Sequence, residues 1–143
     1  MEVPTIIYHK AEILEWHDGD TCKVAIERNV KIDLPDMDLG FRDYVKDGQL
    51  YSNKHIRIWG LNCPELHVGG KVNPTGIAAK NFSESFCPVG MKVRLGTLKN
   101  PEKFGRWLGV IFFEIDGKEK CLNQLILESG NAIPYLQGKL KFW

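Results

Sequence analysis

The sequence predicts an α+β fold in which five antiparallel strands are combined with two helices. Apolar and polar residues alternate in several separate segments, as they do in strands with one buried face. Two other segments repeat apolar residues every three to four positions, which is typical of helices. The chain has 143 residues, of which 43% are hydrophobic and 26% charged, and this size and balance predict one compact domain, 1–143.

The first two strands are expected over 11–16 and 22–32, joined by a hairpin turn. Both segments are rich in β-branched and aromatic residues. Between them stands Asp18-Gly19-Asp20-Thr21, whose central glycine is typical of a hairpin connection. Asp18 and Asp20 flank this glycine, and aspartate is favoured in turns, so Asp18 is expected to support the turn rather than to bind a metal directly.

The third strand is expected to contain Arg57. Because successive side chains of a strand point to opposite faces, the isoleucines on either side enter the core while Arg57 faces outward. The stretch 34–53 before it is polar and rich in turn residues, and it is expected to be a long connection between strands two and three. Asp36 and Asp38 suggest a calcium loop, but the distal glutamate of such loops is absent, which favours a solvated loop.

A first helix is expected from Pro74 to Phe86. Ala78, Phe82 and Phe86 are four residues apart, which places them on one face of a helix. Pro74 suits a helix start, and Pro88 lies just beyond the expected end.

Two further strands and a second helix are expected after it. The strands span 91–98 and 107–115, and the helix spans 121–129 and ends at Gly130. Three strands, a helix, two strands and a helix is the order of a small OB-type barrel, with one helix between strands three and four and another at the C-terminal side. The outer face of such a barrel is suited to oligonucleotides.

Charge, cysteines and hydropathy limit the possible partners. The formal net charge is only +1, so any affinity for polyanions must be local. The four cysteines form no Cys-x-x-Cys pair, which argues against zinc and favours small buried side chains in a reducing environment. No apolar stretch is long enough to cross a membrane and no secretory signal is seen, so a cytoplasmic location and no membrane partner are expected. Secretion of a processed form stays open as an alternative, since a removed signal leaves no trace in the sequence.

Four short motifs occur in a specific order along the chain. They are Asp18-Gly-Asp-Thr21, Arg57 through Pro64-Glu65, Lys103-Phe-Gly-Arg106 and Leu122-Asn123. In this order and spacing the chain resembles the staphylococcal nuclease (thermonuclease) family, calcium-dependent nucleases on an OB-fold barrel. The resemblance covers about 11–135.

The resemblance implies a role for each matching residue. Asp20, Asn62 and the backbone carbonyl of Cys63 match the calcium ligands. Arg57 and Arg106 match the phosphate-binding arginines of the catalytic site, and Glu65 matches its general base. Lys103 and Tyr135 match substrate-binding positions.

One matching position departs from the family. Asn62 stands where the family usually has an aspartate, so a carbonyl oxygen is kept and a negative charge is lost. Calcium affinity depends on the charge of the ligands, and weaker calcium binding than in the family is therefore expected.

The implied chemistry is phosphodiester hydrolysis. Arginine guanidinium groups match phosphate oxygens with paired donors, a cation neutralises further charge, and a glutamate accepts a proton from the attacking water. The predicted function is a calcium-dependent nuclease, a hydrolase of ester bonds, that acts on DNA and possibly RNA with little sequence specificity. No obligate protein partner is evident.

Two alternatives stay open. The first is a catalytically weak or inactive domain of the same kind that binds nucleic acid or protein, for which Asn62 is the one supporting departure. The second is a protein-interaction domain indifferent to nucleic acid, for which the nearly neutral charge is weak support.

Overall fold

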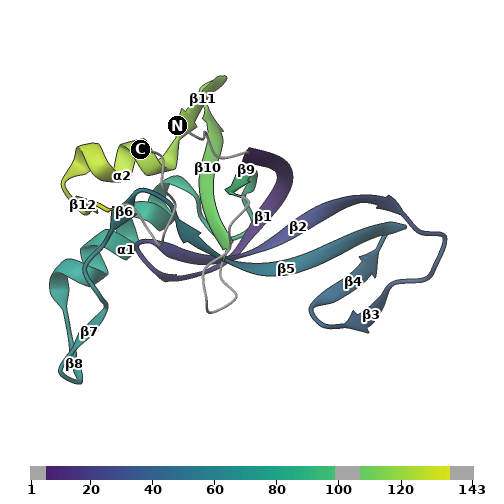
Figure 1. The fold of residues 1–143 in the computed structure, drawn as a ribbon, viewed down its shortest axis with the longest axis horizontal. Helices are drawn as coiled ribbons and strands as arrows, with labels where there is room; N and C mark the ends of the chain where they lie inside the picture. Colours follow the sequence, from purple (N-terminus) through teal and green to yellow (C-terminus); the bar gives the residue numbers. More distant parts are fainter. Residues whose placement is uncertain (1–5, 99–106, 136–143) are drawn as a thin grey trace.

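A computed structural model describes residues 6–98 and 107–135. It shows an α+β fold made of mostly antiparallel strands and two helices, α1 (Pro74–Phe86) and α2 (Leu122–Ser129) (Figure 1). The longer strands are β1 (Ile6–Asp18), β2 (Thr21–Lys31), β5 (Gln49–Ile58), β9 (Lys92–Leu98) and β10 (Trp107–Ile115). The shorter strands are β3 (Met37–Gly40), β4 (Asp43–Lys46), β6 (Leu61–Asn62), β7 (His67–Val68), β8 (Lys71–Val72), β11 (Lys118–Cys121) and β12 (Ile133–Pro134).

The largest sheet has eight strands in the order β11-β10-β9-β1-β2-β5-β4-β3. Neighbouring strands in this order run antiparallel, and β10 also pairs with β5 in parallel. Strands β6 and β12 pair with each other, as do β7 and β8. The alternation of apolar residues predicted all five longer strands, although β1 begins earlier than expected.

The core is formed by the inward faces of the long strands together with α1 and α2. On β5, Ile56 and Ile58 are fully buried, as the alternation around Arg57 predicts. From the other strands, the fully buried Ile13, Val24, Leu95 and Ile111 join the same cluster. Burial of such side chains is the main favourable term in folding.

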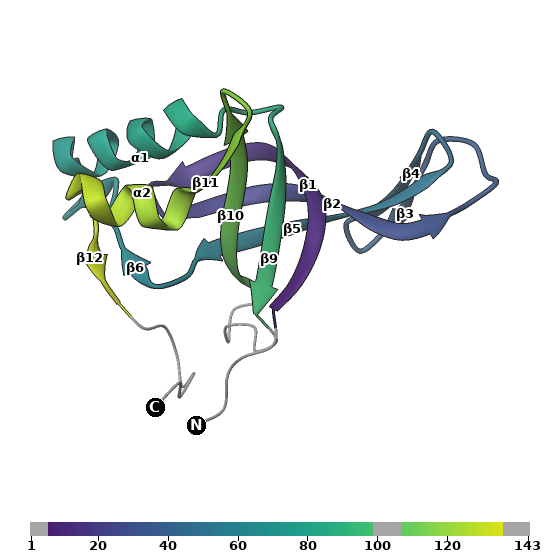
Figure 2. The ribbon, with the colours of Figure 1, turned by 90° about the horizontal axis from the view of Figure 1, so that it is seen from above.

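Both helices lie at one end of the molecule, as Figure 2 shows. The buried face of α1 consists of Gly76, Ala79 and Ser83, with Phe82 partly buried beside it, whereas Ala78 is exposed. Phe82 and Phe86 pack against the core as expected, but the expectation for Ala78 is wrong, because the neighbouring Ala79 is buried in its place. Helix α2 ends at Gly130, whose φ of 80° is the left-handed conformation that glycine adopts without strain.

The segment 34–53 is not the connection that the sequence predicts. It contains β3, β4 and the first residues of β5, which form an arm at the end of the molecule opposite the helices (Figure 2). In this arm the Tyr44 and Tyr51 rings stack, and Val45 is buried. The strands were missed because they are only four residues long and contain aspartate and glycine, which strands disfavour.

The prediction that the cysteines are small buried side chains is confirmed for three of the four. Cys22, Cys63 and Cys87 are buried and Cys121 is partly buried, all with free thiols. Burial raises the pKa of Cys63 and that of Cys87 to about 12 each, so neither is a reactive thiolate at neutral pH.

Candidate functional site

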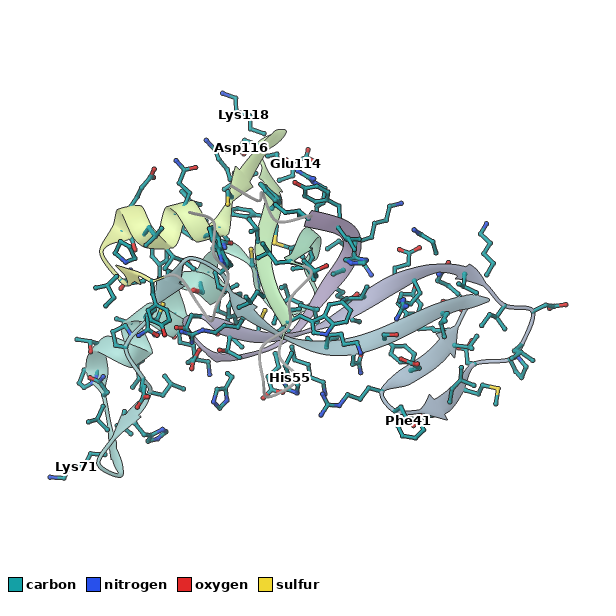
Figure 3. All side chains as sticks on the ribbon, in the orientation of Figure 1. Phe41, His55, Lys71, Glu114, Asp116 and Lys118 are labelled. Atoms are coloured by element: carbon teal, nitrogen blue, oxygen red, sulfur yellow. The ribbon has the colours of Figure 1, made fainter. Side chains whose placement is uncertain are left out.

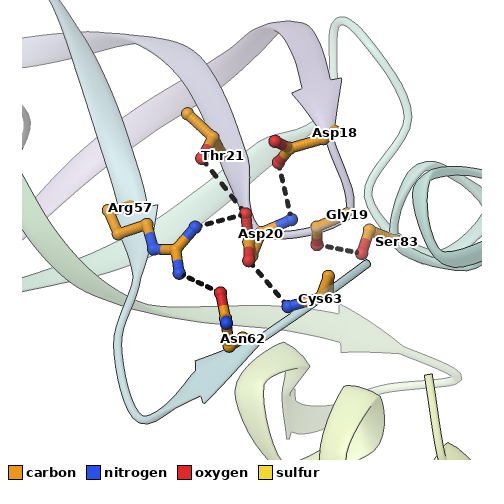
Figure 4. A network of polar contacts seen from close by, with 8 residues as sticks. All are labelled: Asp18, Gly19, Asp20, Thr21, Arg57, Asn62, Cys63 and Ser83. Atoms are coloured by element: carbon orange, nitrogen blue, oxygen red, sulfur yellow. Dashed lines mark hydrogen bonds and ion pairs between the residues drawn. The ribbon is translucent and has the colours of Figure 1, made fainter. Parts of the chain in front are cut away.

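The turn between β1 and β2 is held in place by helix α1. Gly19 packs against α1 on one side, where an added Cβ atom would be 2.9 Å from the Cβ of Ala79. On another side the same atom would be 3.0 Å from the Sγ of Cys63. The buried Ser83 hydroxyl donates a hydrogen bond of 2.7 Å to the Gly19 carbonyl (Figure 4). The position of Asp20, the next residue, is therefore fixed by packing.

Asp20 is the centre of a polar network, shown in Figure 4. Its side chain is only 2% exposed. One carboxylate oxygen lies 2.6 Å from Arg57 Nη1 and 3.3 Å from the Thr21 hydroxyl, and the other accepts the Cys63 N–H at 2.8 Å. Asp18 accepts the Asp20 N–H at 3.1 Å, which confirms its expected role in the turn.

Arg57 faces outward from β5, as predicted, with its side chain 13% exposed. Besides Asp20, its guanidinium contacts Asn62, since Nη2 donates to Asn62 Oδ1 at 2.7 Å. Two contacts through two different nitrogens fix the plane of the guanidinium. The structure thus brings together four of the predicted site residues, Asp20, Arg57, Asn62 and Cys63.

These residues do not fit a bound calcium ion in this arrangement. Calcium takes six to eight oxygen ligands. Asp20 and Asn62 instead direct their oxygens at Arg57, and Cys63 contributes its N–H to Asp20. Among the described residues no three His, Cys, Asp or Glu side chains gather as metal ligands would. Calcium binding stays a prediction that this arrangement does not support.

Glu65 lies on the segment between β6 and β7, where its backbone is held by the start of α1. The Asn73 side-chain amide donates to the Glu65 carbonyl at 2.9 Å, and the Asn73 N–H donates to the Leu66 carbonyl at 2.7 Å. The side chain of Glu65 is exposed. Its backbone is thus fixed while its carboxylate faces solvent, and its role as a general base stays a prediction.

Of the three remaining predicted site residues, Tyr135 is the one that lies among the described residues. Tyr135 follows β12, its N–H donates to the Gly60 carbonyl at 2.9 Å, and it is 47% exposed. It therefore lies beside the turn between β5 and β6, and its contact with a ligand stays a prediction. Lys103 and Arg106 lie outside the described residues.

Helix α1 also supplies residues that hold the site in place, and the sequence alone does not predict them. Ala79 and Ser83 are four residues apart and face the Gly19 turn. Two small residues at this spacing on one helix face are a signal of close packing. The partner that they pack against lies more than fifty residues earlier, and no local pattern identifies it.

The acidity of Asp20 leads to a first testable prediction. Burial, strengthened by the neighbouring Asp18 carboxyl, raises the pKa of Asp20 to about 7, and the Arg57 guanidinium and the Cys63 N–H oppose this shift. A raised pKa favours the protonated native state, so this contribution to stability is complete below the ordinary pKa and is lost as the pH rises through 7. The free energy of unfolding, compared with that of Asp20→Asn, is expected to fall between pH 4.5 and pH 7.5.

Urea unfolding of the wild-type protein and of Asp20→Asn at three pH values in this range measures the difference between their free energies of unfolding. Groups that titrate elsewhere in the chain affect both proteins equally and cancel in this difference. If the wild-type protein instead gained stability over Asp20→Asn as the pH rose, the ion pair with Arg57 would outweigh burial and the expectation would be wrong.

Comparisons with known proteins add one relative. No family model matches the chain. It is 33% identical over 96 residues to an uncharacterised lipoprotein of Mycoplasma pneumoniae, the MG186 homologue, and the match covers 60% of this chain. The chain spans only 32% of the length of that relative. The resemblance to the staphylococcal nuclease family therefore stays a prediction.

The comparison corrects the predicted function. The relative is named as an uncharacterised lipoprotein, and this overturns the prediction of a calcium-dependent nuclease that binds nucleic acid. The alternative of an inactive nucleic-acid- or protein-binding domain gains no positive support either. A lipoprotein is anchored to a membrane, so a cytoplasmic location is not shown for this chain. In the part of the chain that the structure describes, no helix has the length and apolar character needed to span a bilayer.

Proposed function

We propose that the domain binds the phosphate group of a phosphoester at Arg57 and acts on it as a hydrolase. The observation that supports this proposal is the guanidinium of Arg57, held in one plane by Asp20 and Asn62 on an outward sheet face. An arginine has five N–H donors in a rigid fork, and the two contacts to Asp20 and Asn62 leave others for a ligand. Such a fork matches the oxygens of a phosphate.

Asn62 favours an anion over a cation at this site. A carboxylate at this position would add a second negative charge beside Arg57, whereas the Asn62 amide supplies an acceptor without charge. Among the described residues Asp20 alone then balances the charge of Arg57, and the raised pKa of Asp20 weakens even this negative charge near neutral pH. The guanidinium therefore keeps more attraction for an anion than it would between two carboxylates.

The hydrolase part of the proposal depends on Glu65. A carboxylate on a fixed backbone and open to solvent can accept a proton from water. We assign it this role without a bound metal ion. The phosphate would be held by Arg57, whose positive charge meets the charge that develops on the phosphoryl oxygens.

We also infer that β1, β2, β5, β9 and β10 form the five-stranded OB-type barrel. These strands pair in the order β10-β9-β1-β2-β5, and the parallel pairing of β5 with β10 joins the two ends of this order. In such a barrel the face that carries Arg57 is the outer face of β5, where these barrels bind their ligands.

The binding of inorganic phosphate provides the test. Because hydrogen bonds to charged groups are worth about 1.5–3 kcal/mol, Arg57→Ala is expected to weaken phosphate binding by about tenfold to a hundredfold. Arg57→Lys should recover only part of the affinity, because an ammonium group lacks the planar fork. Isothermal titration calorimetry measures both, with circular dichroism to show that the variants are folded.

Arg94→Ala is the matched control, because Arg94 is an exposed arginine paired with Glu119 on another part of the sheet. Equal phosphate affinity of wild type, Arg57→Ala and Arg94→Ala would refute the binding proposal. The hydrolase part is tested with a chromogenic phosphodiester in the presence of a chelator. It fails if the wild-type protein shows no turnover or if Arg57→Ala does not reduce it.

A further inference from the structure

A hollow of about 260 Å³ lies next to Arg57 on the outward face of β1, β2 and β5. Its lining residues come from all three strands and are Glu15, His17, Thr21, Lys23 and His55. Figure 3 labels His55 on the lower side of the sheet, and the exposed Phe41 of the β3–β4 arm lies on the same side.

Strand register places this hollow in line with Arg57. Thr21 pairs with Arg57, and two residues further along, Lys23 pairs with His55. Residues two apart on a strand share a face and are separated by about 6.6–6.8 Å. Thr21 thus lies beside Arg57 and also lines the hollow, so the two sites are neighbours on one continuous surface.

The hollow contains several hydrogen-bond donors, namely the Lys23 ammonium and the imidazoles of His17 and His55. Among the ion pairs of the described residues, none involves Lys23, His17 or His55. Burial lowers the pKa of His55, so this imidazole serves as a neutral N–H donor, while Lys23 on the neighbouring strand supplies the positive charge of the hollow. Glu15 is the one acidic residue among the described residues that line the hollow, and it shifts the pKa of His55 in the opposite direction.

We infer that this hollow binds a second phosphate group of the ligand held at Arg57, so that the ligand is a chain of at least two phosphate groups. This inference rests on the proposed phosphate site. Lys23 and the two imidazoles supply N–H donors to the second phosphate, and Thr21, which pairs with Arg57 and lines the hollow, connects the two subsites.

The test compares ligands with one and with several phosphate groups. The probes are inorganic phosphate, tripolyphosphate as a phosphoanhydride chain, and a short sugar-phosphate oligomer as a phosphodiester chain. The double variant Lys23→Gln/His55→Gln is expected to weaken the tighter-binding chain probe by at least about tenfold, while the affinity of inorganic phosphate for the Arg57 site stays unchanged. Glu15→Gln is expected to strengthen chain binding, because it removes the repelling charge.

Lys54→Gln is the matched control, because Lys54 neighbours His55 on β5 but lies over the Trp107 ring. Its chain affinity should equal that of the wild type. Unchanged chain affinity in the double variant would overturn the second subsite and leave the Arg57 site intact. Failure of the Arg57 site is recognised separately, because inorganic phosphate would then bind wild type and Arg57→Ala equally. The chain probe that binds more tightly identifies which spacing of phosphates the surface fits.

Discussion

Replacement of Asn123 by leucine is expected to lower the free energy of unfolding by about 2–6 kcal/mol. Asn123 is buried at the start of α2, and its amide joins three segments. Its oxygen accepts the Ile111 N–H at 3.0 Å, and its Nδ2 donates to the carbonyls of Trp59 at 2.9 Å and Gly109 at 3.1 Å. The side chain therefore holds α2, β10 and the end of β5 together.

The size of this effect follows from what the leucine leaves behind. The Ile111 N–H would lose its acceptor in a buried place, which costs about 1–3 kcal/mol, and two further hydrogen bonds of about 0.5–1.5 kcal/mol each would be lost. The Gly109 carbonyl keeps the Trp59 N–H at 2.9 Å, so it is not left without a donor. Leucine has a similar volume, and little of the loss would come from a cavity.

Urea unfolding, followed by circular dichroism, measures the change. Gln124→Leu is the control on the same helix, because Gln124 is exposed and bonds only to Glu128 among the described residues. It should change the stability by less than about 0.5 kcal/mol. Similar midpoints for the Asn123 and Gln124 variants would show that the buried amide network is not important for stability.

Replacement of Gly76 by alanine is expected to destabilise the protein by about 1–3 kcal/mol and to displace Glu65. A Cβ atom at Gly76 would lie 2.1 Å from the Glu65 carbonyl oxygen and 2.9 Å from the Leu66 Cα. Both are backbone atoms, which cannot move aside as a flexible side chain can. The segment 65–66 must shift, and its hydrogen bonds from Asn73 are then strained or lost.

The direction of this effect is opposite to the one that helix propensity predicts. Gly76 lies in the first turn of α1, where alanine would ordinarily gain up to about 1 kcal/mol. The contribution of helix propensity can be measured separately at the exposed Ala78. Ala78→Gly should lower the free energy of unfolding by about 1 kcal/mol through helix propensity alone. A stabilised Gly76→Ala protein with unchanged amide signals for residues 65 and 66 in NMR spectra would contradict the packing argument.

The parts of the fold that were predictable from sequence are those with a clear period. Ile56 and Ile58 are buried on either side of Arg57 because alternation in a strand is a local rule. Gly130 marks the end of α2 for an equally local reason. The arm of β3 and β4 was missed, since short strands gain their stability from pairing with β5 and not from their own composition.

The contacts of the site can likewise be divided into those that the sequence predicts and those that it does not. The side chains of Asp20 and Arg57 meet as the sequence predicts, because Thr21 pairs with Arg57 in the sheet. The prediction did not include that Arg57 would also take the oxygen of Asn62, which a metal ion needs. It also missed the supports from α1 at Gly76 and Ser83, since a contact between distant segments leaves no periodic trace.

The parallel pairing of β5 with β10 determines when the chain can finish folding. Arg57 pairs in register with Leu108, a residue that a ribosome adds only after fifty further residues. Until then one edge of β5 presents unpaired N–H and C=O groups, and exposed edges of this kind invite pairing with other chains. A fragment that stops before Trp107 should therefore aggregate during synthesis, while the full chain protects the same edge with its own later strand.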